Sequence, residues 1–315
     1  MSFSSALLEV IQVTAPIFII IAAGFIIKKI NLIKEDGVAI LTRLAYNIGL
    51  PALFLLNITE YSLSEIFNVD IIKVIYSTYA AYFVVLLLLT FTVRRSRKTK
   101  GAFFVSSYRV NMAFVGLPIV WAAFGGLALA KATLVIAFLV PVNVISSIII
   151  FKIFNRGEEK FEIKRLLRSV ITDPIVIAAV LGIILSYFNI QLPGFITSSL
   201  DIISGMTVAV ALLSIGASFR FDHLKNDLKI VSYIGFNKLI LMPVLVFLAA
   251  TYIFKMEVSD RNVVVMLFAT PLAVAAYIMA KELRSNYNLV SSALIMTTII
   301  SAITISGWLL VLRYI

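Results

Sequence analysis

Ten apolar runs of about 20 residues follow one another along this chain and restrict it to one class of fold. Runs of this length match helices that cross a bilayer, whereas membrane β-strands are about half as long and alternate apolar with polar residues. With 61% hydrophobic and only 14% charged residues, the chain has too little polar surface for a soluble globule. The sequence therefore predicts an all-α polytopic membrane protein with ten transmembrane helices. The runs lie near residues 8–27, 38–58, 72–93, 102–124, 128–151, 170–189, 199–218, 230–254, 263–280 and 290–312.

The composition argues against several other kinds of protein. Cysteine is absent and the single histidine, His223, falls in a charged loop, so we expect no disulfide framework, no metal site and no cofactor. The net charge of +11 comes from short loops between the apolar runs. There, basic residues orient helices against membrane lipid, so we do not expect nucleic acid as a partner.

Basic residues are concentrated in every second loop. The loops after the first, third, fifth, seventh and ninth runs carry them, as in the segment 94–100, and the loops between carry few. The positive-inside rule places the basic loops in the cytoplasm. With ten runs, both termini then lie on the other side. We predict a multi-pass protein of the cell membrane with its N- and C-termini outside.

The two halves of the chain repeat a pattern at an offset of about 158 residues. The repeated residues are Thr14, Pro16, Gly24 and Asn31 in the first half, and Thr172, Pro174, Gly182 and Asn189 in the second. Five helices per half force the second half to insert upside down, which predicts an inverted repeat about a pseudo-twofold axis in the membrane plane. The predicted division is a first five-helix repeat, 1–151, a short cytoplasmic link, 152–169, and a second repeat, 170–315.

Prolines interrupt the fourth and ninth runs. The interruptions are Gly116-Leu-Pro118 and Thr270-Pro271. Proline removes a backbone donor and clashes with the preceding turn, so the fourth helix is predicted to open near residues 115–118. Freed backbone groups cost several kcal/mol each in hydrocarbon and are tolerated only inside protein or beside a wet cavity. Broken helices at matching places in two halves are typical of secondary transporters, whose site lies where the breaks meet.

Arg109 is the most informative single residue. It lies about nine residues beyond the basic cluster ending at Lys100, roughly 13 Å along a helix. That is close to half the depth of the hydrocarbon core, where arginine costs about 2.5–3.5 kcal/mol. It would attract an anionic substrate and hold a carboxylate through two parallel hydrogen bonds. The alternatives are that it extends to the cytoplasmic face or is a structural counter-ion.

Polar residues and prolines near other interruptions complete the candidate site. The candidates for substrate binding are Asn47, Pro51, Arg109, Asn111, Gly116, Pro118, Asn143, Ser214, Thr270, Pro271 and Tyr277. Asn47, Asn143 and Ser214 also fit a role in helix packing. Lys238, in the eighth run, is expected to reach the cytoplasmic side and to be structural. No acidic residue lies deep inside a run, so we expect weak or no proton coupling.

Several of these motifs together resemble the auxin efflux carrier family, which includes plant PIN proteins and bacterial malate or malonate permeases. The motifs are Asn47-x3-Pro51-Ala-Leu-Phe, Asn111-x4-Gly116-Leu-Pro118, Asp173-Pro174 and Leu212-Leu-Ser-Ile-Gly216-Ala-Ser. The resemblance covers nearly the whole chain. It implies fourth and ninth helices that cross at their prolines, elevator-like alternating access, a homodimer and carboxylate substrates. At the position of Arg109, a small or polar residue is expected in this family, so this arginine departs from the family pattern.

The leading interpretation is a carrier, not an enzyme, that exports a small or aromatic carboxylate. The membrane potential could drive this export at about 2.3 kcal/mol per charge per 100 mV. A sodium-coupled carrier resembling bile-acid symporters and a polytopic ligand sensor without flux are the alternatives. A channel would need a continuous polar stripe, and an intramembrane enzyme would need a catalytic set; the sequence contains neither pattern.

Overall fold

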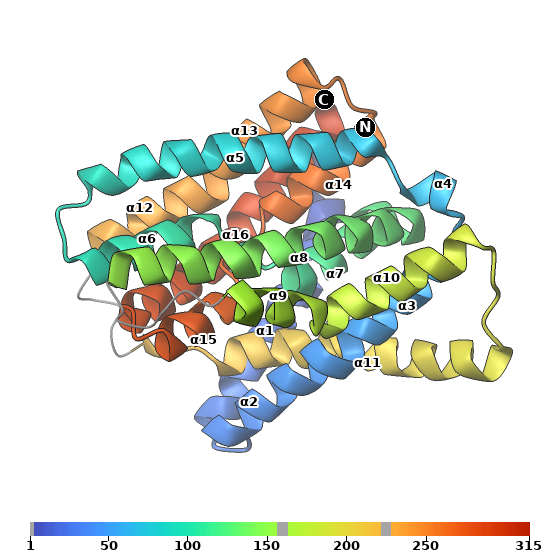
Figure 1. Ribbon diagram of the computed structural model, residues 1–315, viewed down its shortest axis with the longest axis horizontal. Coiled ribbons are helices and arrows are strands. Elements are labelled where there is room, and N and C mark those ends of the chain that lie inside the picture. The colour runs from blue at the N-terminus through green and yellow to red at the C-terminus, as the bar shows by residue number, and fades with distance from the viewer. Residues whose placement is uncertain (1–2, 156–162, 222–227) are drawn as a thin grey trace.

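The computed structural model describes residues 3–155, 163–221 and 228–315, and these ranges are almost entirely helical (Figure 1). The first half contains α1 (Phe3–Lys29), α2 (Glu35–Leu44), α3 (Leu50–Glu60), α4 (Leu63–Ile66), α5 (Val69–Thr92), α6 (Arg97–Tyr108), α7 (Leu117–Phe124) and α8 (Gly126–Asn155). The second contains α9 (Ile163–Ile171), α10 (Pro174–Tyr187), α11 (Gly194–Ala217), α12 (Leu228–Phe236), α13 (Met242–Leu248), α14 (Val258–Phe268), α15 (Val274–Glu282) and α16 (Tyr287–Tyr314). His223 and the middle of the predicted link lie outside the described residues.

Seven helices in the described ranges are long and apolar enough to cross a membrane. They are Ser4–Lys29, Glu35–Glu60, Val69–Thr92, Gly126–Asn155, Gly194–Ala217, Leu228–Ile253 and Tyr287–Tyr314, and two shorter apolar helices are Met112–Phe124 and Pro174–Tyr187. The predicted all-α class with several membrane-spanning helices is confirmed. The ten-helix count and the inverted repeat stay predictions.

In the described residues, four π-helical turns interrupt the longer helices: η1 (Ala45–Gly49), η2 (Met112–Gly116), η4 (Asn237–Leu241) and η5 (Ala249–Ile253). The first three each end two residues before a proline, namely Pro51, Pro118 and Pro243. A proline ring clashes with the carbonyl four residues earlier, and a wider turn moves that carbonyl away, so the helix continues past the proline. The fourth run consequently opens at residues 109–111, not near 115–118 as the sequence predicts.

Helices α1 and α11 touch backbone to backbone, and α3 packs on α10. A Cβ added at Gly24 would lie 2.1 Å from the carbonyl oxygen of Leu213, and one at Gly216 would lie 1.8 Å from that of Ile21. Glycine at these positions is therefore what allows the close approach of α1 and α11. Gly182 similarly lies against α3. Each of the two contacts pairs a helix of one half with a helix of the other half.

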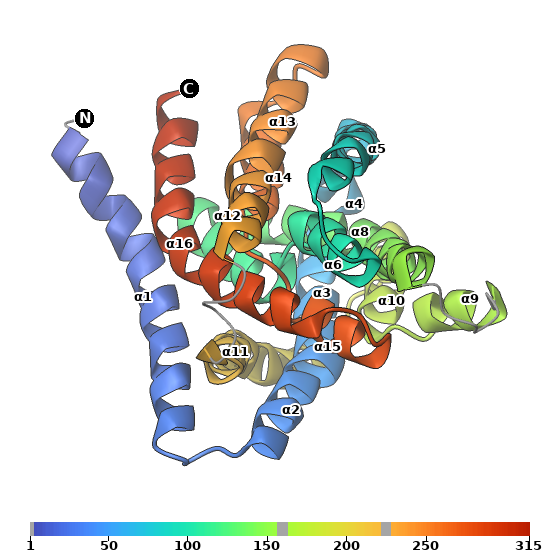
Figure 2. The same cartoon turned by 90° about the vertical axis from the view of Figure 1, so that its left-hand side faces the viewer.

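The remaining helices gather beside these four. Figures 1 and 2 show α5, α6, α12, α13 and α14 on one side of the molecule and α2, α3 and α11 on the other, with α8 between them. α16 packs against both α1 and α12. The two termini lie at the same end of the molecule (Figures 1 and 2).

Candidate functional site

The two interrupted segments meet and pair through their backbones. The N–H of Asn111 donates to the carbonyl oxygen of Pro271 at 2.8 Å, and the N–H of Ala273 donates to that of Arg109 at 3.3 Å. Val110 and Leu272 thereby form an isolated antiparallel bridge. Each break therefore satisfies backbone groups that the other break leaves free, as the interior of a membrane protein requires.

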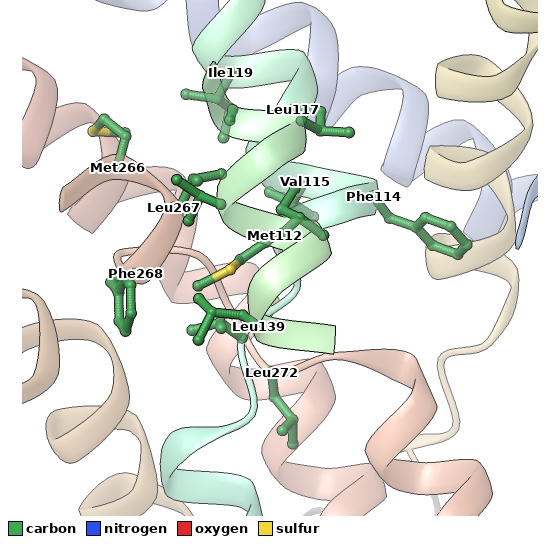
Figure 3. Close-up of a cluster of buried hydrophobic side chains, with 14 of the residues drawn as sticks. Met112, Phe114, Val115, Leu117, Ile119, Leu139, Met266, Leu267, Phe268 and Leu272 are labelled. Carbon is green, nitrogen blue, oxygen red and sulfur yellow. The ribbon is translucent and has the colours of Figure 1, made fainter. Parts of the chain in front are cut away.

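Apolar side chains pack around the paired breaks. Figure 3 shows Met112 and Leu139 close to Leu272, while Leu267 of α14 faces the helix formed by η2 and α7. A Cβ added at Gly116 would lie 2.9 Å from the Cδ2 of Leu267 and 3.3 Å from the Cγ2 of Thr270. Gly116 thus permits α14 to approach the η2 turn closely.

A cavity of about 280 Å³ opens beside the paired breaks. Its wall is drawn from five parts of the chain. The lining residues are Thr42, Arg43, Tyr46 and Asn47 of α2–η1, residues 109–114 at the first break, Ile136, Leu139, Val140, Asn143 and Val144 of α8, Ile175 of α10, and Ala273–Ala275, Ile278 and Met279 near α15. Most of these side chains are apolar, so the few polar groups determine what the cavity binds.

Arg109 is the buried cation of this wall. It follows the last residue of α6 and is 6% exposed, so it does not extend to the cytoplasmic face. Its Nη1 donates to the Oγ of Ser147 at 3.4 Å, and its Nε has no hydrogen-bond partner among the described residues. No aspartate or glutamate within the described ranges forms an ion pair with it. The neighbouring Asn111, 5% exposed, likewise has a side-chain Nδ2 without a partner.

A hydrogen-bonded network from α5 and α8 supports Arg109. The Tyr79 hydroxyl donates to the Oδ1 of Asn143 at 2.8 Å, and the Ser147 hydroxyl donates to the Asn143 carbonyl at 2.6 Å. The hydroxyl oxygens of Tyr108 and Ser147 lie 2.7 Å apart. Asn143 is therefore both a wall residue and part of the framework that positions the arginine.

The opposite wall carries Arg43 and Tyr46, two residues that the sequence analysis missed. The Tyr46 hydroxyl donates to the Oδ2 of Asp173 at 2.8 Å, and the other oxygen of Asp173 accepts the N–H of Ile175 at the start of α10. The Asp173 carboxylate is thus committed to structural hydrogen bonds. Arg43 and Asn47 line the same wall. The sequence feature that could have identified Arg43 is its position four residues before Asn47, which places both side chains on one face of a helix.

The remaining candidates lie outside the cavity wall. They are Pro51, Gly116, Pro118, Ser214, Thr270, Pro271 and Tyr277. The hydroxyl of Thr270 donates to the carbonyl of Leu267 at the end of α14, and that of Ser214 donates to the carbonyl of Ala211 in its own helix, each at 2.7 Å. The ring of Tyr277 contacts the ring of Tyr287 with 6.4 Å between centroids. The prolines and Gly116 act on backbone geometry, as described above.

Lys238 does not reach the surface as the sequence suggested. It is 0% exposed, and its Nζ contacts the carbonyl oxygen of Tyr108 at 3.5 Å and the Sδ of Met242 at 3.6 Å. Tyr108 is the last residue of α6, so the side-chain nitrogen of Lys238 lies beside the C-terminal end of that helix. Lys238 is thus a second basic side chain, separate from Arg109, that is buried beside the first break.

Several apolar helices long enough to cross a membrane, together with two broken segments that pair beside a cavity, are the architecture of a membrane transport protein. The chain belongs to the auxin efflux carrier family: residues 9–309 match the family described as "Membrane transport protein".

Three relatives align over nearly their whole length. An "uncharacterized transporter" of Methanothermobacter thermautotrophicus is 23% identical, covering 94% of this chain and 96% of the relative. One of Methanocaldococcus jannaschii is also 23% identical, covering 93% and 96%. A protein of Rhizobium meliloti named "putative malonate transporter" is 20% identical, covering 97% and 96%.

Proposed function

We propose that this protein is a carrier that exports a small organic anion with a carboxylate group across the cell membrane. The observation that carries the proposal is Arg109, a buried cation on the cavity wall whose Nε has no partner. A guanidinium binds a carboxylate through charge-assisted hydrogen bonds, and the free amide of Asn111 supplies a further donor. Asn47 and Asn143 are the other polar candidates on the wall. The apolar remainder suits the carbon body of such an anion.

Elevator-like alternating access is the mechanism we propose. In it, α1, α2–η1, α3, α10 and α11 form the scaffold, since α2 and η1 pack on α11, and the broken helices move with α8 and α16. The cavity wall draws on both groups, since α2–η1 and Ile175 face the breaks and α8. Sliding one group past the other would therefore carry a bound anion across the membrane. We also propose a homodimer with both termini outside, as the family resemblance and the loop charges suggest.

An inverted repeat of two five-helix halves, 1–151 and 170–315, is part of the same proposal. Two features support it. α1 packs on α11 while α10 packs on α3, which is the reciprocal arrangement that a twofold relation produces. The repeated residues Asn31 and Asn189 also share a rare left-handed backbone conformation, with φ of 60° and 53°.

We propose that the membrane potential drives export without a coupled sodium ion. An anion carries its own charge across the membrane, so the potential can act on the substrate directly. The sodium-coupled carrier and the ligand sensor are the competing functions that the following experiment separates.

Charge movement on a solid-supported membrane tests the proposal with purified protein in liposomes. The substrates are malate, malonate, citrate and indole-3-acetate, with a neutral solute as control, each with and without sodium. Arg109→Ala is compared with Arg94→Ala, which removes an exposed arginine outside the cavity. We expect saturable, sodium-independent currents for at least one acid, retained in Arg94→Ala and lost in Arg109→Ala. Currents that require sodium would indicate the coupled carrier, and binding without current would indicate a sensor.

A further inference from the structure

Two arginine–asparagine pairs face the cavity from different elements. Arg109 and Asn111 lie at the first break, and Arg43 and Asn47 lie on the α2–η1 helix. Arg43 and Asn47 are four residues apart, so their side chains project from neighbouring positions on one helix face. The cavity therefore has two places where a guanidinium and an amide donor occur together.

The two pairs differ in burial and in how many of their side-chain donors are already engaged. Arg109 and Asn111 are buried, whereas Arg43 and Asn47 are exposed. Arg43 and Asn47 have no hydrogen-bond or ion-pair partner in the described part of the chain. The buried pair is thus preorganised at the deep end, and the exposed pair remains free at the rim to receive an anionic group.

Apolar side chains make up most of the rest of the cavity wall. They include Met112, Ile136, Leu139, Val140, Val274 and Ile278. These side chains offer no hydrogen-bond donor to polar groups in the middle of a bound anion. Burying a third charged group of the anion against them would cost desolvation free energy. The wall accordingly suits a short aliphatic chain with a charged group at each end.

We propose that Arg43 and Asn47 bind a second carboxylate of the transported anion, so that the carrier selects dicarboxylates over monocarboxylates. The inference rests on the proposed transport of carboxylates. Two guanidiniums neutralise a dianion, whereas a monocarboxylate leaves Arg43 hydrated and unpaired. Arg43 and Asn47 lie on α2–η1, which packs on the scaffold helix α11, so they act when the anion loads and stay behind when the moving helices slide.

Ligand-induced stabilisation of the purified protein tests this assignment. Its melting temperature is followed in titrations with malonate, succinate and glutarate, and with acetate, propionate and butyrate. The variants are Arg43→Gln, Asn47→Ala, Arg109→Gln and the control Arg94→Gln, which removes an equal charge from an exposed position outside the cavity. Loss of one hydrogen bond to a charged group corresponds to about tenfold in affinity.

The expected result is that Arg43→Gln weakens dicarboxylate binding about tenfold and monocarboxylate binding less than twofold. Arg109→Gln abolishes both, and Arg94→Gln changes neither. Equal losses for both ligand classes in Arg43→Gln, or no loss in either, would overturn the second subsite while Arg109 still supports the proposed function. If the unaltered protein binds no carboxylate, the proposed function and this inference fail together.

Discussion

Asp260 connects three helices away from the cavity. It is 2% exposed, at the start of α14, and accepts hydrogen bonds from the Nζ of Lys131 at 2.6 Å and the Nδ2 of Asn68 at 2.7 Å. Lys131 belongs to α8, and Asn68 precedes α5. A buried ion pair adds little net stability by itself, but removing one member leaves the other charge without compensation.

Asp260→Asn is therefore expected to destabilise the protein by about 3–5 kcal/mol. The matched control is Asp70→Asn, because Asp70 forms an exposed pair with Lys73 at 2.8 Å whose loss costs less than about 1 kcal/mol. Melting temperatures of both variants in one detergent measure the difference. Equal melting temperatures would show that the buried ion pair contributes no more to stability than the exposed pair does.

The sequence identified single residues of the cavity wall where a charged residue lies far from the ends of an apolar run. Arg109 stood out because it is a charge far from a loop, and the structure places it, with Asn111, on the cavity wall. Arg43 did not stand out, because a basic residue near the end of an apolar run ordinarily orients a helix. That its helix faces the breaks follows from tertiary packing, which no local pattern reports.

At the scale of elements, the contact between α1 and α11 depends on single glycines. Gly216→Ala would place a methyl group 1.8 Å from the Ile21 carbonyl oxygen, so the two helices must separate. We expect a loss of at least about 1–3 kcal/mol, as for other overpacked interfaces. Gly205→Ala, on the same helix with no atom within 4 Å, is the control and should be neutral or slightly stabilising. Thermal unfolding of the pair provides the test, and similar curves would contradict the backbone contact.

The broken helices show which part of an element a sequence can predict. Proline placed interruptions in the correct runs, since its chemistry is local. It did not place the opening of the fourth run, because the η2 turn accommodates Pro118 and the helix opens at residues 109–111 instead. The hydrogen bond from Asn111 to the Pro271 carbonyl is made by backbone atoms, and such pairing leaves no side-chain signature.

At the scale of the whole molecule, the predicted orientation can be tested because the chain contains no cysteine. Ser64→Cys places a single thiol on α4, between the second and third runs, and Arg95→Cys places one after the third run. The positive-inside rule predicts that an impermeant maleimide labels Ser64→Cys in intact cells. Arg95→Cys should react only after permeabilisation. The reverse pattern would show that the termini lie inside.

Composition and run length were sufficient to predict the class of the whole molecule. An all-α membrane protein follows from the hydrocarbon environment, which admits few alternatives. The family followed from motifs spread over nearly the whole chain. The shape of the cavity did not follow, because it depends on how distant helices such as α2 and α8 come together, and only the folded chain brings them to one place.

The backbone pairing between residues 109–111 and 271–273 also bears on how the protein can evolve. Main-chain atoms hold the two segments together, so the side chains of Val110, Asn111 and Ala273 on the cavity wall are free to change without loosening that joint. Descendants of one ancestral carrier can therefore acquire a new substrate through a few point substitutions while keeping the same paired breaks.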